Sequence, residues 1–412
     1  MQLSDVNLND LDVFERSVPH EWFRLLRREA PVHWHDEADG PGYWNITRYD
    51  DLKAISRNPS VYSSERMGTL LRETDPAGLP IMRKIMLNMD PPQHRQHRML
   101  VNKAFTPRMI DGLRPRIQEL VTQIVDDVIE KGECDFVEEL AAPLPMLVIC
   151  EMMGVPAEDR RRVYEVGNSM VGFDDPELQP DGQPRRSGDD AFAEMFMYGA
   201  KLREKALSHP GEDLATGLVN VEIEGRKLTA EEFNFFFLLL LIAGNETTRT
   251  VTTNGMISLL ENPSQLRLLK DDVSLVDSAV EDIPRYSPAV HSFRRTATRD
   301  TEIRGVPIRE NDKIILWYPS ANRDEEIFEA PDRFDIRRSP NDHVAFGYGE
   351  HYCLGANLAR MELQEIFRGI AARIDRLEMT EPPRRLRSNF INGVKEMRVR
   401  FSPDRRSKSR AA

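Results

Sequence analysis

One cysteine lies in a loop that is suited to hold an anionic sulfur. The segment FGYGEHYCLG (residues 346–355) places Cys353 between glycines and directly before a strongly helical stretch. The free N–H groups and the positive end of a helix stabilise an anion, and glycines let backbone donors approach sulfur without Cβ clashes. A thiolate in such a loop could bind a metal ion. The alternative is a buried, inert cysteine, which is the commonest state of a lone Cys.

A second group of reactive side chains interrupts the most apolar run of the chain. Residues 233–244 are almost entirely apolar, and Asn245, Glu246, Thr247 and Thr248 follow at once. Polar groups inside a buried helix cost free energy unless they are used. An acid beside a hydroxyl could deliver protons within a dry site. The alternatives are a kink caused by back-bonding Thr side chains, or a helix that emerges into solvent.

Basic residues that could bind an anion occur at two further places. His94 and Arg98 are four positions apart and therefore share one face of a predicted helix. Arg295 lies in a segment with β character, and a guanidinium group suits bidentate pairing with a carboxylate. Without further context, His94 and Arg98 would be interpreted as an ordinary solvated helix face.

The pattern of apolar residues predicts the elements that position these groups. Residues 40–56 are typical of a short strand pair followed by a helix, and residues 107–153 show the three- and four-residue spacing of amphipathic helices. Residues 173–190 are rich in Pro, Gly and Asp, which predicts a long surface loop that could act as a lid. Thr229 and Glu232 form a capping-box signature, so we expect the helix with the apolar run to begin there.

The C-terminal half is predicted to alternate between helical and β segments. We expect helix over residues 255–288, short β segments over 294–320, mostly irregular structure over 323–352 and helix over 354–375. The last residues, 403–412, form a polar and basic tail.

Composition narrows the class of protein. With 412 residues, 40% hydrophobic and 30% charged, the chain can bury a large core, and its net charge of -12 argues against a general nucleic-acid binder. The N-terminus lacks a positive region and an apolar stretch, and residues 233–244 fall short of the about 18 apolar residues that a membrane span needs. We therefore expect a cytoplasmic protein.

Cys134, Cys150 and Cys353 are widely spaced and odd in number, which fits neither a disulfide framework nor a CxxC zinc site.

Together these motifs resemble those of the cytochrome P450 family. The cysteine loop agrees with the family pattern FxxGxxxCxG at every fixed position, and its continuation HYCLGANLARMEL is similar to the soluble bacterial members. AGNETT (residues 243–248) resembles the signature [AG]Gx[DE]T[TS], and DPPQHRQHR (residues 90–98) resembles the family's DPPxHxxxR helix start. The resemblance covers roughly residues 10–402. It implies a mainly α-helical triangular prism with small β-sheets, formed as one domain over residues 1–412.

The resemblance also implies haem b as the cofactor and assigns roles around it. Cys353 is the implied axial ligand of the iron, and strong donation from a thiolate is what lets haem iron cleave the O–O bond. Glu246 is the implied acid of a proton relay and Thr247 the hydroxyl that steadies the oxygen intermediate, in a helix that opens locally over the haem. Phe346 is implied to pack near the sulfur. The other implied cofactor-binding residues, which include those that pair with the propionates, are His94, Arg98, Arg295, His351, Gly244 and Gly355.

Electrons are expected to come from other proteins, because no GxGxxG follows a strand to bind flavin or nicotinamide. By resemblance, NAD(P)H acts through a ferredoxin reductase and a ferredoxin on a monomeric enzyme. Ferredoxins of this kind are acidic, so the docking face near Cys353 should be basic, with Arg95 and Arg360 as candidates. A peroxide-driven haem-thiolate enzyme and a non-catalytic haem sensor are the alternatives, and the Glu246–Thr247 pair argues against both.

One motif departs from the family pattern. The family carries ExxR in a helix that locks to an arginine further along the chain, whereas this chain has Glu281, Asp282, Pro284 and Arg285. The acid in register with Arg285 is Asp282, which is one methylene shorter, and Glu281, one turn before Arg285, is the alternative partner. Pro284 removes a backbone donor, which costs about 3 kcal/mol inside a helix. Arg333 is the expected third member of this structural clamp.

The expected substrate pocket is almost entirely apolar, and such a pocket selects by shape and by excluding water. We therefore expect a steroid or sterol side chain, a terpenoid, or a fatty or branched lipid as substrate. The segments AGNETTR, SFRRTATRD and SANRDEEIF most resemble actinobacterial-type members that oxidise sterol side chains and branched lipids. The candidate pocket residues are Met67, Leu70, Leu71, Met170, Val171, Phe173, Leu239, Ile242, Ala243, Val290, Phe293 and Ile391.

Overall fold

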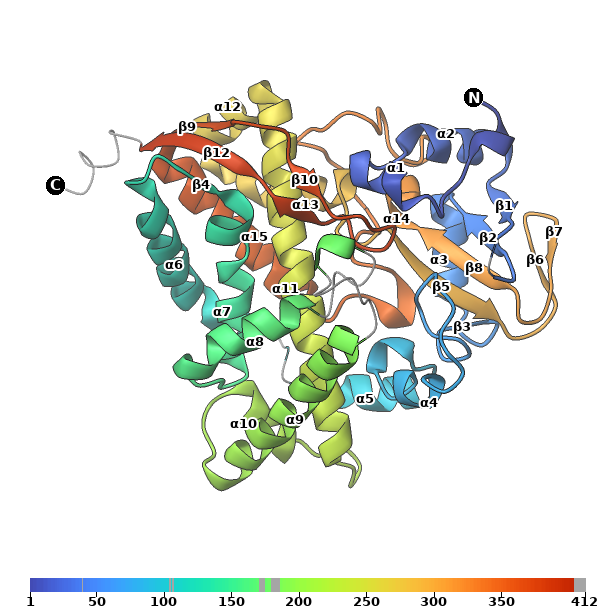
Figure 1. Ribbon diagram of the computed structural model, residues 1–412, viewed down its shortest axis with the longest axis horizontal. Helices are drawn as coiled ribbons and strands as arrows, with labels where there is room; N and C mark the ends of the chain where they lie inside the picture. Colours follow the sequence, from blue (N-terminus) through green and yellow to red (C-terminus); the bar gives the residue numbers. More distant parts are fainter. Residues whose placement is uncertain (39, 104, 106, 170–174, 179–185, 404–412) are drawn as a thin grey trace.

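The computed structural model describes residues 1–403, apart from residues 39, 104, 106, 170–174 and 179–185. Helices dominate the described chain and surround one long helix, α11 (Ala230–Glu261), which crosses the molecule in Figure 1. The other helices are α1 (Leu11–Arg16), α2 (His20–Glu29), α3 (Tyr49–Ser56), α4 (Leu79–Met82), α5 (Gln93–Asn102), α6 (Pro107–Ile129), α7 (Pro143–Met152), α8 (Ala157–Ser169), α9 (Arg186–Ser208), α10 (Leu214–Asn220), α12 (Pro263–Asp271), α13 (Val276–Tyr286), α14 (Tyr318–Ala321) and α15 (Ala356–Arg373).

The strands form small sheets at the edges of the helical body (Figure 1). They are β1 (Val32–His35), β2 (Tyr43–Ile46), β3 (Tyr62–Ser63), β4 (Glu133–Asp135), β5 (Ser292–Ala297), β6 (Thr301–Ile303), β7 (Val306–Ile308), β8 (Lys313–Trp317), β9 (Ile374–Met379), β10 (Arg384–Arg385), β11 (Val394–Glu396) and β12 (Arg398–Pro403). The largest sheet has the order β1-β2-β8-β5-β3, in which β2 and β8 are parallel and the other neighbours antiparallel. The smaller sheets are β4-β12-β9, β10-β11 and β6-β7.

Helix α11 is apolar on nearly every side and forms the centre of the fold. Its 32 residues span about 48 Å at the usual helical rise. It begins at the predicted capping box, because the Thr229 hydroxyl accepts from the N–H of Glu232 and the Glu232 carboxylate accepts from the N–H of Thr229. Phe233, Phe237 and Leu241 are buried on it, and it packs against α7, α9, α13 and α15. A helix enclosed in this way provides a rigid wall for a cavity.

The hydrophobic core divides along the same lines as the secondary structure. The largest cluster joins residues of α6, α7, α11, α13 and α15, and two smaller clusters lie around the five-stranded sheet. In one of these, the fully buried Trp317 of β8 contacts the rings of Phe14 and Phe23, with centroid separations of 5.9 and 5.4 Å. This contact ties the N-terminal helices to the sheet that carries Arg295.

Most of the predicted elements are confirmed, and three differ in detail. The mainly α-helical fold, the helix at the end of residues 40–56 and the helix after Cys353 are present. Of the strand pair predicted within residues 40–56, only β2 lies there, because its partner β1 precedes this range. Residues 107–153 form α6 and α7, but β4 and a π-helical turn (Val137–Ala141) lie between them. The predicted loop 173–190 lies partly outside the described residues, and its end is helical because α9 begins at Arg186. Within the described part of the chain, no helix combines the length and hydropathy that a membrane crossing requires.

Candidate active site

A cavity opens between α11, the start of α15, the cysteine loop, α5 and β5. It encloses about 1630 Å³ of atom-free space, counting the solvent at its mouth. Cys353 and Phe346 line one side, Ala243, Gly244 and Thr247 of α11 line another, and the residues predicted to bind an anion also reach it. These last residues are His94, Arg98, Arg295 and His351, and Gly355 of the cysteine loop is also part of the lining. The structure therefore gathers the cysteine loop, Thr247 and the basic residues around one cavity, whereas Glu246 and the structural clamp are not part of its lining.

The cysteine loop is folded back on itself so that Cys353 faces the cavity. The N–H of Cys353 donates to the carbonyl oxygen of Phe346 at 2.8 Å. Gly347 and Gly349 have φ angles of 74° and 72°, in the left-handed region that favours glycine. A Cβ on Gly349 would lie 2.5 Å from the carbonyl oxygen of Ser56, so the loop approaches α3 more closely than another residue would allow. The glycines of the motif thus fix the position of the sulfur.

The surroundings of the Cys353 thiol act on its pKa in opposite directions. Cys353 is exposed to the cavity, but the protein around it limits its hydration and raises its pKa, whereas the N–H of Gly355 and the charges of Arg98 and Arg360 lower it, and the net shift is upward. The helix-end donor that the sequence predicts is therefore present, but it does not by itself outweigh this loss of hydration. A metal cation at the sulfur would supply the missing stabilisation of the thiolate. Cys134 and Cys150 are buried, and burial raises the pKa of each thiol to about 12, as expected of inert core residues.

Basic side chains gather at one edge of the cavity. The rings of His94 and His351 lie 4.4 Å apart, and burial with the nearby charge of Arg98 lowers the pKa of His94 to about 4. Arg295 is 4% exposed, and burial lowers its pKa. Among the residues that the structure describes, neither Arg98 nor Arg295 forms an ion pair with a carboxylate, and Nδ1 of the buried His94 has no hydrogen-bond partner. Buried cations are usually paired, so this edge suits an anionic ligand.

The wall formed by α11 presents a hydroxyl to the cavity. Oγ1 of Thr247 donates to the carbonyl oxygen of Ala243 at 2.5 Å. The helix remains continuous through these residues, so the local opening that the family resemblance implies is not present in this structure. Glu246 is buried outside the cavity lining, where it pairs with Arg249 and accepts from the hydroxyl of Thr250. Burial raises the pKa of Glu246, and the Arg249 charge opposes that shift.

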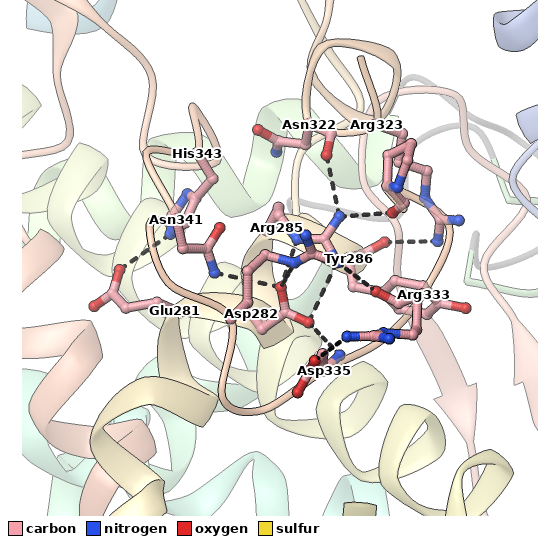
Figure 2. Close-up of polar contacts among 12 residues, drawn as sticks. Glu281, Asp282, Arg285, Tyr286, Asn322, Arg323, Arg333, Asp335, Asn341 and His343 are labelled. Carbon is pink, nitrogen blue, oxygen red and sulfur yellow. Dashed lines mark hydrogen bonds and ion pairs between the residues drawn. The ribbon is translucent and has the colours of Figure 1, made fainter. Parts of the chain in front are cut away.

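Asp282 is the ion-pair partner of Arg285 (Figure 2). Both side chains are fully buried. Nε and Nη2 of Arg285 donate to the Asp282 carboxylate at 2.5 and 3.2 Å. The N–H of Asp335 donates to the same carboxylate at 2.7 Å. Arg285 also donates to the carbonyl oxygens of Asn322, Pro331 and Arg333. Because α13 stays helical through Pro284, the shorter acid keeps the geometry of the clamp.

The third member of the clamp is Arg338, which corrects the expectation for Arg333. Nε of Arg338 donates to the Asp282 carboxylate at 3.0 Å. The Arg333 side chain is 68% exposed and pairs with Asp335, so that only its backbone carbonyl contacts Arg285. Glu281, the alternative partner of Arg285, instead binds His343 and Arg360. Spacing alone did not distinguish these arginines, because residues 331–340 have no regular period.

The predicted pocket residues divide into three groups. Leu239, Ala243, Val290 and Phe293 line the cavity. Met67, Leu70, Leu71, Ile242 and Ile391 are not in its lining: Leu71 belongs to the cluster around Trp317, Ile242 packs on the helical core, and Ile391 forms a β-bridge with Val290. Met170, Val171 and Phe173 lie outside the described residues.

Several lining residues were missed by the sequence reasoning. Phe236 and Leu240 line the cavity and precede Ala243 and Thr247 at helical spacing, so that periodicity along α11 could have identified them. Met86, Ala289 and Tyr318 come from segments without such a signal. Glu362 also lines the cavity, is 2% exposed, and has an oxygen without a hydrogen-bond partner among the described residues. Burial raises the pKa of Glu362 to about 8.

The chain is similar in sequence and in structure to known proteins. A family model described as Cytochrome P450 matches residues 200–384. A steroid C26-monooxygenase of Rhodococcus jostii (strain RHA1) is 39% identical over 405 residues, which cover 96% of this chain and 84% of that protein. A linalool 8-monooxygenase of Pseudomonas putida is 35% identical and covers 96% of this chain and 99% of that protein.

The fold agrees with the same family. A cytochrome P450 of Mycobacterium marinum, solved in complex with pseudoionone, superposes with a TM-score of 0.88 at 35% identity, covering 94% of this chain and 97% of that chain. A Bacillus megaterium enzyme in complex with corticosterone has a TM-score of 0.83 at 32% identity, covering 93% and 98%. With this identity over almost its whole length, the chain belongs to the cytochrome P450 family of monooxygenases.

Proposed function

We propose that the chain is a haem-thiolate monooxygenase that inserts one atom of O2 into a steroid or lipid substrate. The observation that carries the proposal is the composition of one cavity. Cys353 faces it from one side, the Thr247 hydroxyl lines the α11 side, and a group of basic residues lies at its edge. The rest of the lining is mostly apolar, which suits a hydrophobic substrate.

The donor set fits haem b. Haem b carries two propionates, and the cavity offers two arginines that lack a carboxylate partner among the described residues, Arg98 and Arg295. His94 and His351 lie beside them, and the free Nδ1 of His94 is available to a ligand. We propose that these four residues bind the propionates and that Cys353 ligates the iron. Phe346, Gly244 and Gly355 would contact the macrocycle.

Haem held by a thiolate supplies the activation of dioxygen. The protein supplies the donors and the dry surroundings. Thr247 has a single hydroxyl proton, which is engaged by Ala243, and rotation of the side chain would turn that donor into the cavity. Glu246 is the proposed proton source, and its raised pKa suits that role. Because Glu246 is paired with Arg249, we expect proton delivery to require that this ion pair opens.

The proposed substrate class follows from the lining and from the relatives. The residues facing the cavity between α11 and β5 include Leu239, Leu240, Val290 and Phe293, whose side chains offer no strong hydrogen bonds. The relatives named above act on steroids and linalool, and the solved neighbours hold pseudoionone and corticosterone. All are hydrophobic, and two are rigid fused-ring molecules. We therefore propose a steroid or sterol side chain first, with terpenoids and branched lipids as the next candidates.

We propose a ferredoxin with its NAD(P)H-dependent reductase as the electron source, on the strength of the resemblance to bacterial members. The distinguishing experiment compares three supplies: ferredoxin with reductase and NAD(P)H, hydrogen peroxide alone, and neither. We expect product only with the first. Product with peroxide alone would indicate a peroxide-driven enzyme, and no product from any supply would indicate a sensor.

The substrate proposal is tested by optical titration of the purified protein. A cholesterol-type steroid, linalool and a branched fatty acid are each titrated while the low-spin to high-spin change of the haem spectrum is recorded. We expect the steroid to give the tightest binding and a hydroxylated product on turnover. If only the fatty acid changed the spin state, the steroid assignment would be wrong while the monooxygenase assignment would stand.

A further inference from the structure

Glu281 connects α13 to both sides of the cysteine loop. Its Oε1 accepts from Nε of Arg360 at 2.6 Å, and its Oε2 accepts from Nη2 of the same guanidinium at 3.0 Å. Oε2 also lies 3.1 Å from Nε2 of His343. Arg360 belongs to the helix that follows Cys353, and His343 precedes the cysteine loop (Figure 2 shows the Glu281–His343 contact). One carboxylate therefore joins three separate segments.

The hydrogen bonds fix which nitrogen of His343 carries the proton. The N–H of Ala345 donates to Nδ1 of His343 at 3.2 Å, so Nδ1 is an acceptor. Nε2 then bears the proton and donates to Glu281. The His343 side chain is 2% exposed, and its ring lies 5.7 Å from that of Phe346. Glu281 thus holds one ring that packs on the cavity-lining Phe346.

Arg360 contacts Phe346 as well. Its guanidinium lies 4.5 Å from the centroid of the Phe346 ring, and its Nη1 donates to the hydroxyl of Tyr352 at 3.3 Å. Because Tyr352 directly precedes Cys353 in the chain, these contacts place the positive charge of Arg360 against the cysteine loop. The bidentate contact with Glu281 both orients this guanidinium and compensates its charge.

We propose that Glu281 is a positioning residue for the proposed haem thiolate: it holds Arg360 and His343 against Phe346 and sets the net charge beside Cys353. The proposal rests on the proposed function, in which Cys353 is the ligand of the iron. In this arrangement Asp282 supports the fold through its ion pair with Arg285. The neighbouring Glu281 instead acts on the cysteine loop, through its ion pair with Arg360.

The proposal predicts opposite effects for the two partners of the ion pair. Reduction of the haem adds negative charge, so an uncompensated cation nearby favours the reduced state. Glu281→Gln leaves Arg360 without its counter-charge and should raise the midpoint potential. Arg360→Gln removes the cation and should lower it. The double variant Glu281→Gln/Arg360→Gln should lie between them. A role in stability alone would not produce shifts of opposite sign.

Asp277 provides a matched control. It lies on the same helix as Glu281 and pairs with Arg368 on α15, so Asp277→Asn also removes an ion pair between α13 and α15. Among the residues that the structure describes, Asp277 forms its ion pair with Arg368 and none with the cysteine loop, so we expect its variant to keep the wild-type potential. Glu281→Asp, which retains the charge, should restore most of the wild-type value.

The experiment measures the midpoint potential of the haem by optical redox titration in the purified wild type and these variants. The reduced carbon monoxide spectrum is recorded on every sample. Shifts of equal sign in Glu281→Gln and Arg360→Gln, or no shift in either, would overturn the proposal if the thiolate spectrum is intact. A wild type without the thiolate spectrum would instead overturn the proposed function. Should Glu281→Gln fail to retain haem, the proposal then requires a lowered potential in Arg360→Gln together with a nearly wild-type potential in Glu281→Asp, and any other result would overturn it.

Discussion

At the scale of single residues, the two sides of the cavity differ in charge and polarity. The edge with His94, Arg98 and Arg295 concentrates positive charge, whereas α11 contributes two threonines, Thr247 and Thr248, to an otherwise apolar wall. A buried polar group costs free energy unless it is hydrogen-bonded, and the Thr247 hydroxyl avoids that cost by donating to the carbonyl oxygen of Ala243. The cations that lack a carboxylate partner fit an anionic cofactor, as proposed, and the Thr247 hydroxyl is the proposed donor to dioxygen.

Replacing Thr247 should separate oxygen consumption from product formation. Thr247→Ala removes the hydroxyl that we propose directs protons to the bound oxygen. We expect the electrons from NAD(P)H to form hydrogen peroxide instead of product, while substrate binding persists. The measurement is product and peroxide formed per NAD(P)H consumed, and product should fall at least several-fold. Thr252→Ala is the control, since Thr252 makes the same type of back-bond, to Thr248, outside the cavity lining. Equal coupling in Thr247→Ala and wild type would remove Thr247 from the mechanism.

Glu362 should make stability depend on pH. Its pKa of about 8 lies well above the ordinary value for a glutamate in an unfolded chain, which is about 4.3. Between these two pH values Glu362 is protonated in the native state and ionised in the unfolded chain. Stability should therefore fall as the pH rises from about 5 to 8. In Glu362→Gln this loss should be smaller, by an amount on the order of a few kcal/mol at pH 8. Thermal unfolding of both proteins across the range checks this, and parallel curves would contradict it.

At the scale of elements, adjacent residues of α13 serve two different partners. Asp282 and Arg285 join the helix to the irregular segment 331–340, while Glu281 contacts α15, the helix that follows Cys353. A one-residue change in register along a helix rotates a side chain by about 100°, which is enough to point these two carboxylates at different segments. The departure from the family's ExxR pattern is thus accommodated locally.

Removing the buried acid should cost more than removing its neighbour. Asp282→Ala leaves the buried Arg285 and Arg338 without their carboxylate, and breaking a buried pair in this way typically costs about 3–5 kcal/mol. Glu281→Ala breaks a partly exposed pair and should cost about 1 kcal/mol. Chemical denaturation and haem retention on gel filtration provide the comparison. The reverse ranking would move the structural role to Glu281.

The sequence predicted elements where the local signal is strong. The capping box at Thr229 determined the start of α11, and the glycine-rich loop before α15 placed Cys353. The partner of Arg285 could not be predicted, because Glu281 and Asp282 both lie within one helical turn of it. Arg338 was missed for a related reason. Residues 331–340 are irregular, so their sequence does not indicate which arginine side chain contacts the buried Asp282. Likewise, an apolar residue such as Leu71 can line a pocket or pack in the core, and the structure places Leu71 in the core.

At the scale of the whole molecule, the net charge of -12 requires that any acidic partner meets a local basic surface. The expected docking cations, Arg95 and Arg360, are each paired with an acid, Glu350 and Glu281 respectively. Lys53 and Arg57 lie over the ring of Tyr348 in the cysteine loop, at 4.8 and 4.7 Å from its centroid. In the described part of the chain, neither forms an ion pair with a carboxylate. These two cations therefore replace Arg95 and Arg360 as the candidate docking residues.

Reversing the charge at Arg57 should slow electron delivery. With Arg57→Glu we expect slower ferredoxin-driven reduction of the haem, because complementary charge accelerates encounter. Added salt should shrink the difference, since the Debye length falls to about 8 Å at physiological ionic strength. Stopped-flow reduction at two salt concentrations measures this, with the substrate-induced spin change as a check on folding. Arg161→Glu, on the exposed face of α8, is the control and should reduce at the wild-type rate. Identical rates and salt responses in all three proteins would exclude this docking surface.

The assignment of Cys353 as the haem ligand is the central claim, and the reduced carbon monoxide spectrum tests it most directly. The wild type should show the far red-shifted Soret band of thiolate ligation. Cys353→Ser should lose that band, because a serine hydroxyl does not supply the thiolate. Cys134→Ser and Cys150→Ser, which change buried core residues, should keep it. A red-shifted band that persists in Cys353→Ser would contradict the account.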